Sequence, residues 1–395
     1  MKTWVFYLFI FFISFDAFAS PKCDYSDVYQ IQVSLNPKDP KSKKIPYYYR
    51  LKNGTDSQNP TVIFIPGGPG EHSIGFDPTV PAQYSLIQID PRGTGCNQEV
   101  FDQEDRSFYN GENLAHDILE LIIKLKLKNY IVYGSSYGTV LATILTNTLA
   151  KKYTHQPISL VLESTLGRAT ESLKEAYGHF SEIWNEKFKP LTMEQKKPFL
   201  SDSPFGLTQE ELGEFLFQAL YGEESYLDQL IKMGTKSENH DYIKRAITRD
   251  LTALAKQEES ENEYLFKKIS CEELHRFPVA QPKLIAGKLE FEAASYYCEE
   301  FFLSNPFDSK NYPISVPIYY FVGKKDPITP PWQTNLHFIK QPELTKKTQT
   351  IISNEPHAAL QALTECQTEV WEAMYKHLPL KNALKECPQE VKILQ

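Results

Sequence analysis

The chain has 395 residues, an apolar fraction of 41% and a formal net charge of −8. This composition excludes general disorder, and an acidic chain without a basic cluster argues against a nucleic-acid partner. The length exceeds that of one ordinary domain and suits one large α/β domain that carries an insertion.

Residues 1–19 have the features of a signal peptide. Lys2 supplies a positive charge, Trp4 to Phe15 form an apolar stretch, and Ala17-Phe18-Ala19 is an A-x-A cleavage site. The apolar stretch is shorter than the roughly 20 residues that a membrane-spanning helix needs. We therefore expect an exported protein without a membrane span after signal removal, located in the periplasm or outside the cell.

The cysteines all follow the expected signal peptide, and none forms a C-x-x-C or Cys/His metal pattern. An even number of cysteines in an exported chain favours three disulfides, although the residues alone do not select the pairing. The cysteines are Cys23, Cys96, Cys271, Cys298, Cys366 and Cys387.

Residues 20–168 are expected to form the first part of an α/β core. Alternating residues predict an antiparallel hairpin, and apolar runs that end at turns predict buried strands separated by helices. The expected elements are a hairpin within Tyr29–Leu51, strands at Thr61–Ile65, Leu86–Ile89, Tyr130–Tyr133 and Ile158–Leu162, and a helix at Glu112–Leu125. This alternation is typical of a parallel sheet covered by helices on both faces, with functional residues beyond the carboxyl ends of its strands.

Residues 169–305 are helical in pattern and charged, without a convincing strand, and we interpret them as an inserted helical cap. The core then resumes over residues 306–395. The expected cap helices are Glu171–Phe188, Gln209–Tyr221, Ser225–Met233 and Asp241–Lys268. The expected elements of the second core part are strands at Val316–Val322 and Thr350–Ile352 and a closing helix at Thr364–His377.

The segment around Ser136 reads G-x-S-x-G between a buried strand and a helical pattern. Glycines at both flanks allow a sharp turn that exposes the serine hydroxyl, and the following helix presents its N-terminus to a developing oxyanion. A merely structural serine is the alternative for so short a pattern. The strand–turn–helix context favours a nucleophile.

Asp326 and His357 complete a candidate catalytic triad with Ser136. A serine hydroxyl needs a base, and the base needs a carboxylate that fixes its tautomer. Asp326 follows one expected strand and His357 follows the next, in the Ser…Asp…His order that this topology imposes. Taken singly, Asp326 reads as a turn residue and His357 as one of nine ordinary histidines; their order and context favour a triad.

The glycine-rich loop Gly67-Gly-Pro-Gly70 ends an expected strand. Backbone N–H groups in such a loop turn toward a neighbouring site, so we expect Gly68 and Tyr137 to supply the two donors of an oxyanion hole. Neither phosphate-loop pattern is present, and a plain tight turn is the alternative. Chemistry of this kind requires no metal or organic cofactor.

Four motifs at the ends of expected strands agree with one known family. They are Gly67-Gly-Pro-Gly70, Asp90-Pro-Arg-Gly-Thr-Gly95, Gly134-Ser-Ser-Tyr-Gly-Thr139 and Asp326-Pro-Ile-Thr-Pro330. They resemble the α/β-hydrolase serine peptidases of the prolyl aminopeptidase group, and more closely the exported bacterial tripeptidyl aminopeptidases. The likeness extends from about Cys23 to Cys387.

The resemblance implies an α/β-hydrolase fold with an inserted helical cap, and an enzyme that removes residues from the free N-terminus of peptides. It also implies the disulfides Cys23–Cys96, Cys271–Cys298 and Cys366–Cys387. In the family an acidic group holds the α-ammonium of the substrate, and the matching positions here are Glu273 and Glu163. As ordinary residues, Glu273 would be a solvated charge on a cap helix, and Glu163 would only cap the segment after its strand.

Some positions depart from the family pattern. Ser135 replaces a commoner glycine, Glu163-Ser164 replaces a usual Asp-Gly, and Glu355-Pro356 precedes the histidine. The first of these hardly affects the mechanism, and the last two leave the substrate open. Two other functions therefore stay under consideration, an esterase or lipase that uses the same triad and a catalytically silent binding protein of the same fold.

Overall fold

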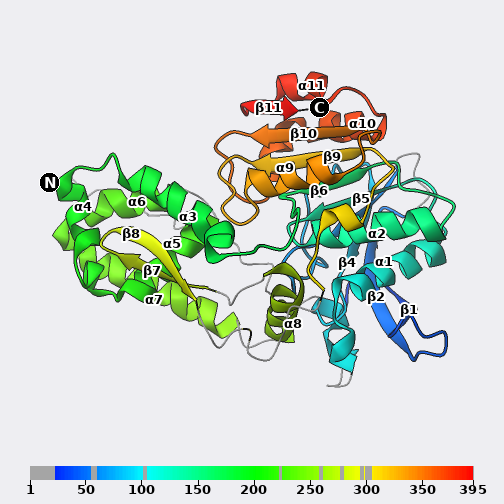
Figure 1. Ribbon diagram of the computed structural model, residues 1–395, viewed down its shortest axis with the longest axis horizontal. Coiled ribbons are helices and arrows are strands. Elements are labelled where there is room, and N and C mark those ends of the chain that lie inside the picture. Colours follow the sequence, from blue (N-terminus) through cyan, green and yellow to red (C-terminus); the bar gives the residue numbers. More distant parts are fainter. Residues whose placement is uncertain are drawn as a thin grey trace.

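The computed structural model describes residues 23–54, 60–100, 105–221, 225–257, 261–275, 280–293, 298 and 305–394. The expected signal peptide, residues 1–19, lies outside this part of the chain. Figure 1 shows two regions, a core built on a large sheet and a smaller, mainly helical region formed by the chain between β6 and β9.

The core sheet has nine strands within the described residues, in the order β1-β2-β4-β3-β5-β6-β9-β10-β11. The strands are β1 (Val28–Ser34), β2 (Lys44–Lys52), β3 (Thr61–Ile65), β4 (Ser85–Ile89), β5 (Tyr130–Ser135), β6 (Leu160–Glu163), β9 (Ile318–Gly323), β10 (Lys347–Ile352) and β11 (Val391–Leu394). Pairing is parallel from β4 through β10 and antiparallel at both edges. The mostly parallel sheet expected from the sequence is confirmed.

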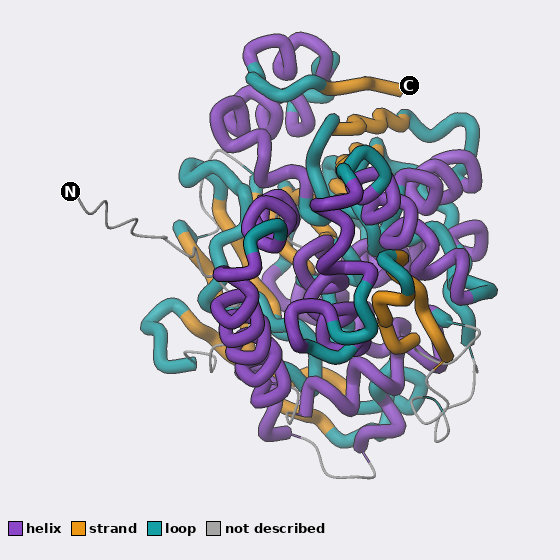
Figure 2. The backbone as a smooth tube through the Cα atoms, turned by 90° about the vertical axis from the view of Figure 1, so that its left-hand side faces the viewer, coloured by secondary structure: helices purple, strands orange, loops and turns teal. Residues whose placement is uncertain are grey.

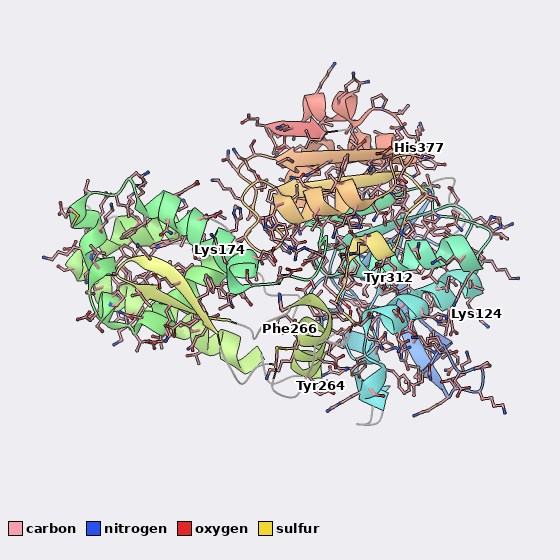
Figure 3. All side chains as sticks on the ribbon, in the orientation of Figure 1. Lys124, Lys174, Tyr264, Phe266, Tyr312 and His377 are labelled. Carbon is pink, nitrogen blue, oxygen red and sulfur yellow. A yellow bond between two sulfur atoms is a disulfide. The ribbon has the colours of Figure 1, made fainter. Side chains whose placement is uncertain are left out.

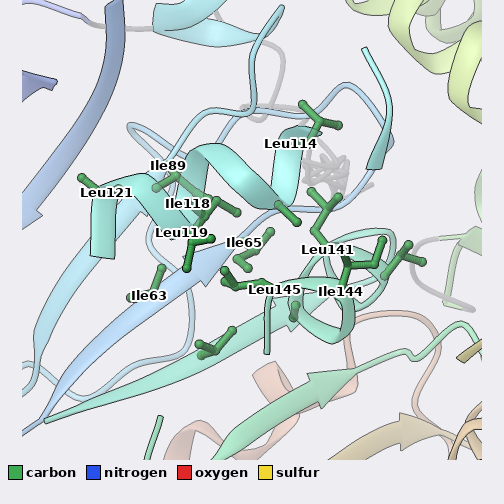
Figure 4. Packing of buried hydrophobic residues seen from close by; sticks show 14 of the residues in the cluster. Ile63, Ile65, Ile89, Leu114, Ile118, Leu119, Leu121, Leu141, Ile144 and Leu145 are labelled. Atoms are coloured by element: carbon green, nitrogen blue, oxygen red, sulfur yellow. The ribbon is translucent and has the colours of Figure 1, made fainter. Parts of the chain in front are cut away.

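Both faces of this sheet are buried by helices. Ile63 and Ile65 belong to the cluster that packs under α1 (Gly111–Leu125) and α2 (Gly138–Lys152), as Figure 4 shows. The intervening Phe64 belongs to the opposite cluster, with the helices near the C-terminus. Those helices are a 3₁₀ segment (Ala359–Cys366), α10 (Gln367–Tyr375) and α11 (Leu380–Ala383). Strands covered on both sides read as continuous apolar runs because successive side chains point to opposite faces.

The region between β6 and β9 corresponds to the expected cap, but it is not wholly helical. Its helices are α3 (Leu173–Phe188), α4 (Met193–Lys196), α5 (Gln209–Tyr221), α6 (Ser225–Gly234), α7 (His240–Gln257) and α8 (Glu261–Ile269). Figure 1 shows α3 to α7 as a separate bundle, with α8 between that bundle and the core, and Figure 2 views the molecule from the side of the bundle. Figure 3 labels Tyr264 and Phe266 on this connecting helix.

Two expectations for the cap are wrong. An antiparallel hairpin, β7 (Ala280–Ile285) and β8 (Lys288–Ala293), stands where no strand was expected. The alternation of charged and apolar residues in Lys288–Ala293 is a local strand signal that the sequence analysis overlooked. The hairpin also packs closely on α5, because a Cβ on Gly213 would lie 2.6 Å from Lys283 Cα. The single helix expected at Asp241–Lys268 is divided into α7 and α8, on either side of residues that the structure does not describe.

The C-terminal part differs from the expectation in two places. Strand β11 follows β10 and pairs with it, although no strand was expected after Thr350–Ile352. The expected closing helix at Thr364–His377 begins with the end of the 3₁₀ segment and continues as α10. No helix within the described residues is long and apolar enough to cross a membrane.

Three disulfides link the described cysteines, in the pairs that the family resemblance implies. They are Cys23–Cys96, Cys271–Cys298 and Cys366–Cys387. Closing chain loops of this size stabilises a fold mainly by restricting its unfolded state.

Candidate active site

Ser136 occupies a sharp turn between β5 and α2 with φ of +53°, a left-handed conformation that non-glycine residues rarely adopt. Its flanking glycines are required by close backbone contacts. A Cβ on Gly134 would lie 2.4 Å from the Gly138 carbonyl oxygen, and one on Gly138 would lie 2.2 Å from the Ile65 oxygen. The strained turn therefore presents the Ser136 side chain at the carboxyl edge of the sheet.

His357 and Asp326 form the acid–base pair that the sequence predicts. His357 Nδ1 lies 2.9 Å from Asp326 Oδ2, and the aspartate is fully buried. Thr329 donates to the same carboxylate through its backbone N–H (2.9 Å) and its hydroxyl (2.8 Å). These contacts fix the carboxylate, so the histidine is held in one tautomer and orientation.

The charges of this pair shift both pKa values. Burial alone would raise the pKa of Asp326, but His357 and the donors from Thr329 outweigh burial and hold that pKa below its usual value. Burial alone would lower the pKa of His357, but Asp326 raises it, with further contributions from Glu163 and Glu71, and the net shift is upward. The histidine is thus suited to accept a proton.

Glu163, at the end of β6, ties the histidine loop to the nucleophile turn. Its backbone carbonyl accepts from the Ser136 N–H at 2.9 Å. Its carboxylate accepts from the Tyr133 hydroxyl and from the Leu360 N–H, both at 2.6 Å. The neighbouring Ser164, also left-handed with φ of +53°, accepts from the backbone N–H of the residue after His357. Glu163 and Ser164, which replace a usual Asp-Gly of the family, thus both lie at this junction.

The expected oxyanion donors Gly68 and Tyr137 belong to two segments that meet at Ser136. Tyr137 is the N-cap residue of α2, so the helix makes no use of its backbone N–H. Gly68 has φ of +96°, and a Cβ on it would lie 2.6 Å from the Gly70 nitrogen. A Cβ on Gly67 would lie 2.9 Å from Ser136 Cβ. The glycine-rich loop therefore lies directly against the nucleophile.

Asp90 holds this loop in place, a role that the sequence analysis did not assign. Its Oδ1 accepts from the backbone N–H groups of Ser73 (2.7 Å) and Ile74 (2.9 Å), a few residues beyond the loop. Its Oδ2 accepts from the Cys96 N–H at 2.8 Å, next to the Cys23–Cys96 disulfide. The motif Asp90-Pro-Arg-Gly-Thr-Gly95 thus acts as a support behind the candidate oxyanion hole.

The sequence analysis also missed Glu71, which directly follows the glycine-rich loop. Its Oε2 lies 3.0 Å from the position that a Cβ on Gly67 would take. Burial raises the pKa of Glu71, while His357 and the Gly67 N–H oppose that shift. The signal in the sequence was a single acidic residue after Gly67-Gly-Pro-Gly70, which no local pattern distinguishes from a surface glutamate.

Of the two expected ammonium-binding residues, Glu163 has both carboxylate oxygens engaged by the contacts described above. Glu273 lies in the turn after α8 and is buried, with Oε1 accepting from the Gly111 N–H at 2.8 Å and Oε2 3.5 Å from the Tyr137 hydroxyl. Burial raises the pKa of Glu273 to about 7. The structure therefore places it against α1 and the side chain of Tyr137. Within the described residues, no cluster of three His, Cys, Asp or Glu side chains is arranged to hold a metal ion.

Comparisons with known proteins agree on the fold. The family model described as alpha/beta hydrolase fold matches residues 60–360. The solved structure of VinJ is similar with a TM-score of 0.50 at 13% identity, covering 89% of this chain and 99% of its own. A proline iminopeptidase from Mycobacterium smegmatis has a TM-score of 0.48 at 12% identity, covering 88% and 98% of the two chains. The esterase RhEst1 from Rhodococcus sp. ECU1013 has a TM-score of 0.48 at 15% identity, with the same coverage. No curated protein matches the sequence.

Proposed function

The chain belongs to the alpha/beta hydrolase fold family, and we propose that it is an exported serine aminopeptidase that acts at the free N-terminus of peptides. The observation that carries the proposal is the buried Asp326–His357 pair beside the strained Ser136 turn. A base that is oriented by a carboxylate, at the same sheet edge as a serine on a strained turn, is the arrangement that activates a serine nucleophile.

In the first step Ser136 attacks the scissile carbonyl while His357 takes its proton. Asp326 keeps the imidazole oriented and stabilises the positive charge that forms on it. The oxyanion is received by the backbone N–H groups of Gly68 and Tyr137. Each such donor contributes roughly 3 kcal/mol to transition-state stabilisation where its removal has been measured in other hydrolases.

His357 then protonates the leaving amine, and the shortened peptide departs from the acyl-enzyme. In the second step a water molecule loses a proton to His357 and attacks the acyl carbon. Collapse of that intermediate returns the proton to Ser136 and releases the acid. Each step uses side chains and backbone groups of the chain alone.

Two features favour a peptide N-terminus over a neutral ester. The motifs around Gly68, Asp90 and Ser136 resemble those of aminopeptidases, and the carboxylates of Glu71 and Glu163 act electrostatically on His357. A partly buried site that carries negative charge favours a substrate that brings a positive one. Export is supported by the three disulfides, which persist in oxidising compartments.

The test compares one acyl group presented in three forms, as an aminoacyl anilide, as its N-acetylated analogue and as a short acyl ester. An aminopeptidase cleaves the free-amine anilide and leaves the acetylated one nearly untouched. Ester hydrolysis without anilide hydrolysis would instead identify an esterase. If none of the three substrates is hydrolysed, and if Ser136→Ala binds them as wild type does, the chain is a catalytically silent protein.

A further inference from the structure

Glu71 extends from the glycine-rich loop across Gly67 toward the nucleophile. A Cβ on Gly67 would lie 2.9 Å from Ser136 Cβ and 3.0 Å from Glu71 Oε2. Because both distances start from one point, Glu71 Oε2 and Ser136 Cβ are no farther apart than those two distances combined. Glu71 is only partly exposed, so it is reachable from solvent yet held close to the reacting atoms.

A negative charge on Glu71 opposes formation of the oxyanion unless a cation is bound beside the carboxylate. Among the described residues, His357 is the charged group that acts on this carboxylate. His357 is neutral when it begins to act as a base, so it then supplies no positive charge. An ionised Glu71 would repel the oxyanion that forms at Gly68, since like charges interact strongly in a partly buried site.

We propose that Glu71 binds the α-ammonium of the first residue of the substrate, and that the enzyme removes one residue per turnover. This inference rests on the proposed aminopeptidase function and assigns its specificity to a residue outside the family pattern. The ammonium places a positive charge between Glu71 and the developing oxyanion. Its N–H groups also give the carboxylate the charge-assisted donors that a buried carboxylate needs.

Backbone dimensions decide between removal of one residue and removal of three. In the first residue, the α-nitrogen lies about 2.5 Å from its own carbonyl carbon. A serine oxygen attacks that carbon from about 3 Å, and an ammonium–carboxylate hydrogen bond spans about 2.8 Å. These lengths suit a carboxylate oxygen that lies no farther from Ser136 Cβ than the two distances at Gly67 combined. In a tripeptidyl substrate, two further residues would carry the ammonium about 7 Å farther away.

The other two glutamates near the site have contacts that bind both of their carboxylate oxygens. Glu163 accepts from Tyr133 and Leu360 with one oxygen each. Glu273 accepts from Gly111 with one oxygen and lies near the Tyr137 hydroxyl with the other. Glu71 also accepts from the Gly67 N–H, but it is the one of the three that lies beside Gly67 and Ser136.

The experiment measures kcat and KM on four substrates. An aminoacyl anilide, its N-acetyl derivative and a tripeptidyl anilide share one acyl residue at the cleaved bond, and the fourth substrate is a simple 4-nitrophenyl ester that carries no amino group. The proteins are wild type, Glu71→Gln, Glu273→Gln and the control Glu214→Gln. Glu214 is a matched control because it is a partly exposed cap glutamate whose pKa is also raised by burial, bonded to Gln218.

We expect wild type to prefer the aminoacyl anilide over the tripeptidyl anilide by at least tenfold in kcat/KM. Glu71→Gln should raise the KM for the aminoacyl anilide by about 30-fold to 100-fold, equivalent to the loss of one charged hydrogen-bonded pair. Its hydrolysis of the ester should be at least as fast as that of wild type, because the ester brings no ammonium and the variant has no carboxylate charge to repel the oxyanion. Glu214→Gln should match wild type throughout.

Three results would overturn the inference while leaving the aminopeptidase proposal intact. They are a Glu71→Gln variant with unchanged aminoacyl kinetics, a wild-type preference for the tripeptidyl anilide, and a KM increase in Glu273→Gln instead. An equal loss of ester and anilide hydrolysis in Glu71→Gln would also overturn it, because Glu71 would then act on the triad itself. If wild type cleaves esters but no free-amine anilide, the proposed function fails, and the ammonium site fails with it.

Discussion

The carboxyl edge of the core sheet and the cap are held together by different kinds of contact. At the sheet edge, backbone segments meet so closely that Gly138 cannot carry a Cβ, and the buried Asp326 is fixed by several hydrogen bonds. In the cap, aromatic rings pack around Trp184, whose ring centroid lies 5.7 Å from that of Phe199. Close backbone contacts and hydrogen bonds thus fix the positions of groups at the sheet edge, whereas the cap is held together by the packing of apolar side chains.

The two regions meet at the loop that carries the catalytic acid. Ile328, two residues after Asp326, packs against the aromatic cluster of the cap. Substitutions at the sheet edge should therefore affect catalysis far more than stability. Substitutions inside the cap should affect stability far more than catalysis. Each prediction below tests one side of this difference.

The largest effect is expected at the nucleophile and its base. Ser136→Ala and His357→Ala should each reduce kcat by about six orders of magnitude, and the double variant should lose little more, because the triad acts as a unit. Steady-state hydrolysis of the aminoacyl anilide, with thermal unfolding as a control for folding, provides the measurement. Losses that multiply in the double variant would show that His357 is not the base for Ser136.

Asp326→Asn should reduce kcat by about four orders of magnitude, because an asparagine stabilises the wrong tautomer of His357. Asp308→Asn is a matched control, since Asp308 lies outside the triad and pairs with Lys340 at 2.8 Å. That control should retain kcat within a few fold. A strong loss in Asp308→Asn, with near-normal Asp326→Asn, would reassign the catalytic acid.

In the cap, Trp184→Ala should destabilise the protein by about 3–5 kcal/mol, because it empties a fully buried ring site. It also removes the indole N–H that donates to the Gly287 carbonyl at 2.8 Å. Denaturant unfolding gives the free energy, and kcat for the ester at low temperature should change less than tenfold. A loss of ester turnover comparable to that of Asp326→Asn would contradict the expectation that cap substitutions affect stability far more than catalysis.

Glu273 connects the cap to the core and predicts a pH-dependent stability. Burial raises the pKa of Glu273 from an ordinary 4.5 to about 7, so the folded state binds the proton more tightly than the unfolded state. Its contribution is fully present below about pH 4.5 and is lost as pH rises to about 7. Glu273→Gln should therefore stabilise the protein above pH 7 by on the order of 3 kcal/mol. Identical unfolding midpoints for both proteins at pH 5 and pH 8 would refute this.

The smallest effect concerns the pH dependence of activity. His357 must be neutral to accept the serine proton, so kcat/KM should fall as pH drops through its pKa, which Asp326 raises above the usual value for a histidine. The Glu163 carboxylate helps to raise that pKa, and Glu163→Gln should therefore move the acid limb of the pH profile to lower pH. An acid limb that stays at the same pH or moves to higher pH would show that Glu163 affects His357 only through its hydrogen bonds and not through its charge.

The difference between the core sheet and the contacts made by distant segments also explains which features could be predicted from the sequence. Strands such as β3 and β9 were predicted to within a few residues, because burial on both faces produces continuous apolar runs. The order of Ser136, Asp326 and His357 along the chain followed from the sheet topology, and the structure brings Asp326 and His357 into contact. These features depend on local pattern and on rules of chain connection.

The features that were missed depend on contacts between distant segments. The hairpin of β7 and β8 alternates apolar and charged residues, and its place is determined by packing on α5. Glu71 follows a recognisable motif, yet only the folded loop brings its carboxylate close to Gly67 and Ser136. Glu163 was expected to face the substrate, whereas its carboxylate is bonded to Tyr133 and Leu360. No pattern in one sequence encodes such partners.

The most direct test of the account is covalent labelling by a fluorophosphonate, followed by peptide mapping. A nucleophilic serine beside an oriented histidine reacts with this probe, and an ordinary serine does not. We predict one label per chain, on Ser136, with labelling abolished in Ser136→Ala, greatly slowed in His357→Ala and preserved in Trp184→Ala. An unlabelled wild-type protein, or a label on any other serine, would contradict the assignment of Ser136 as the nucleophile.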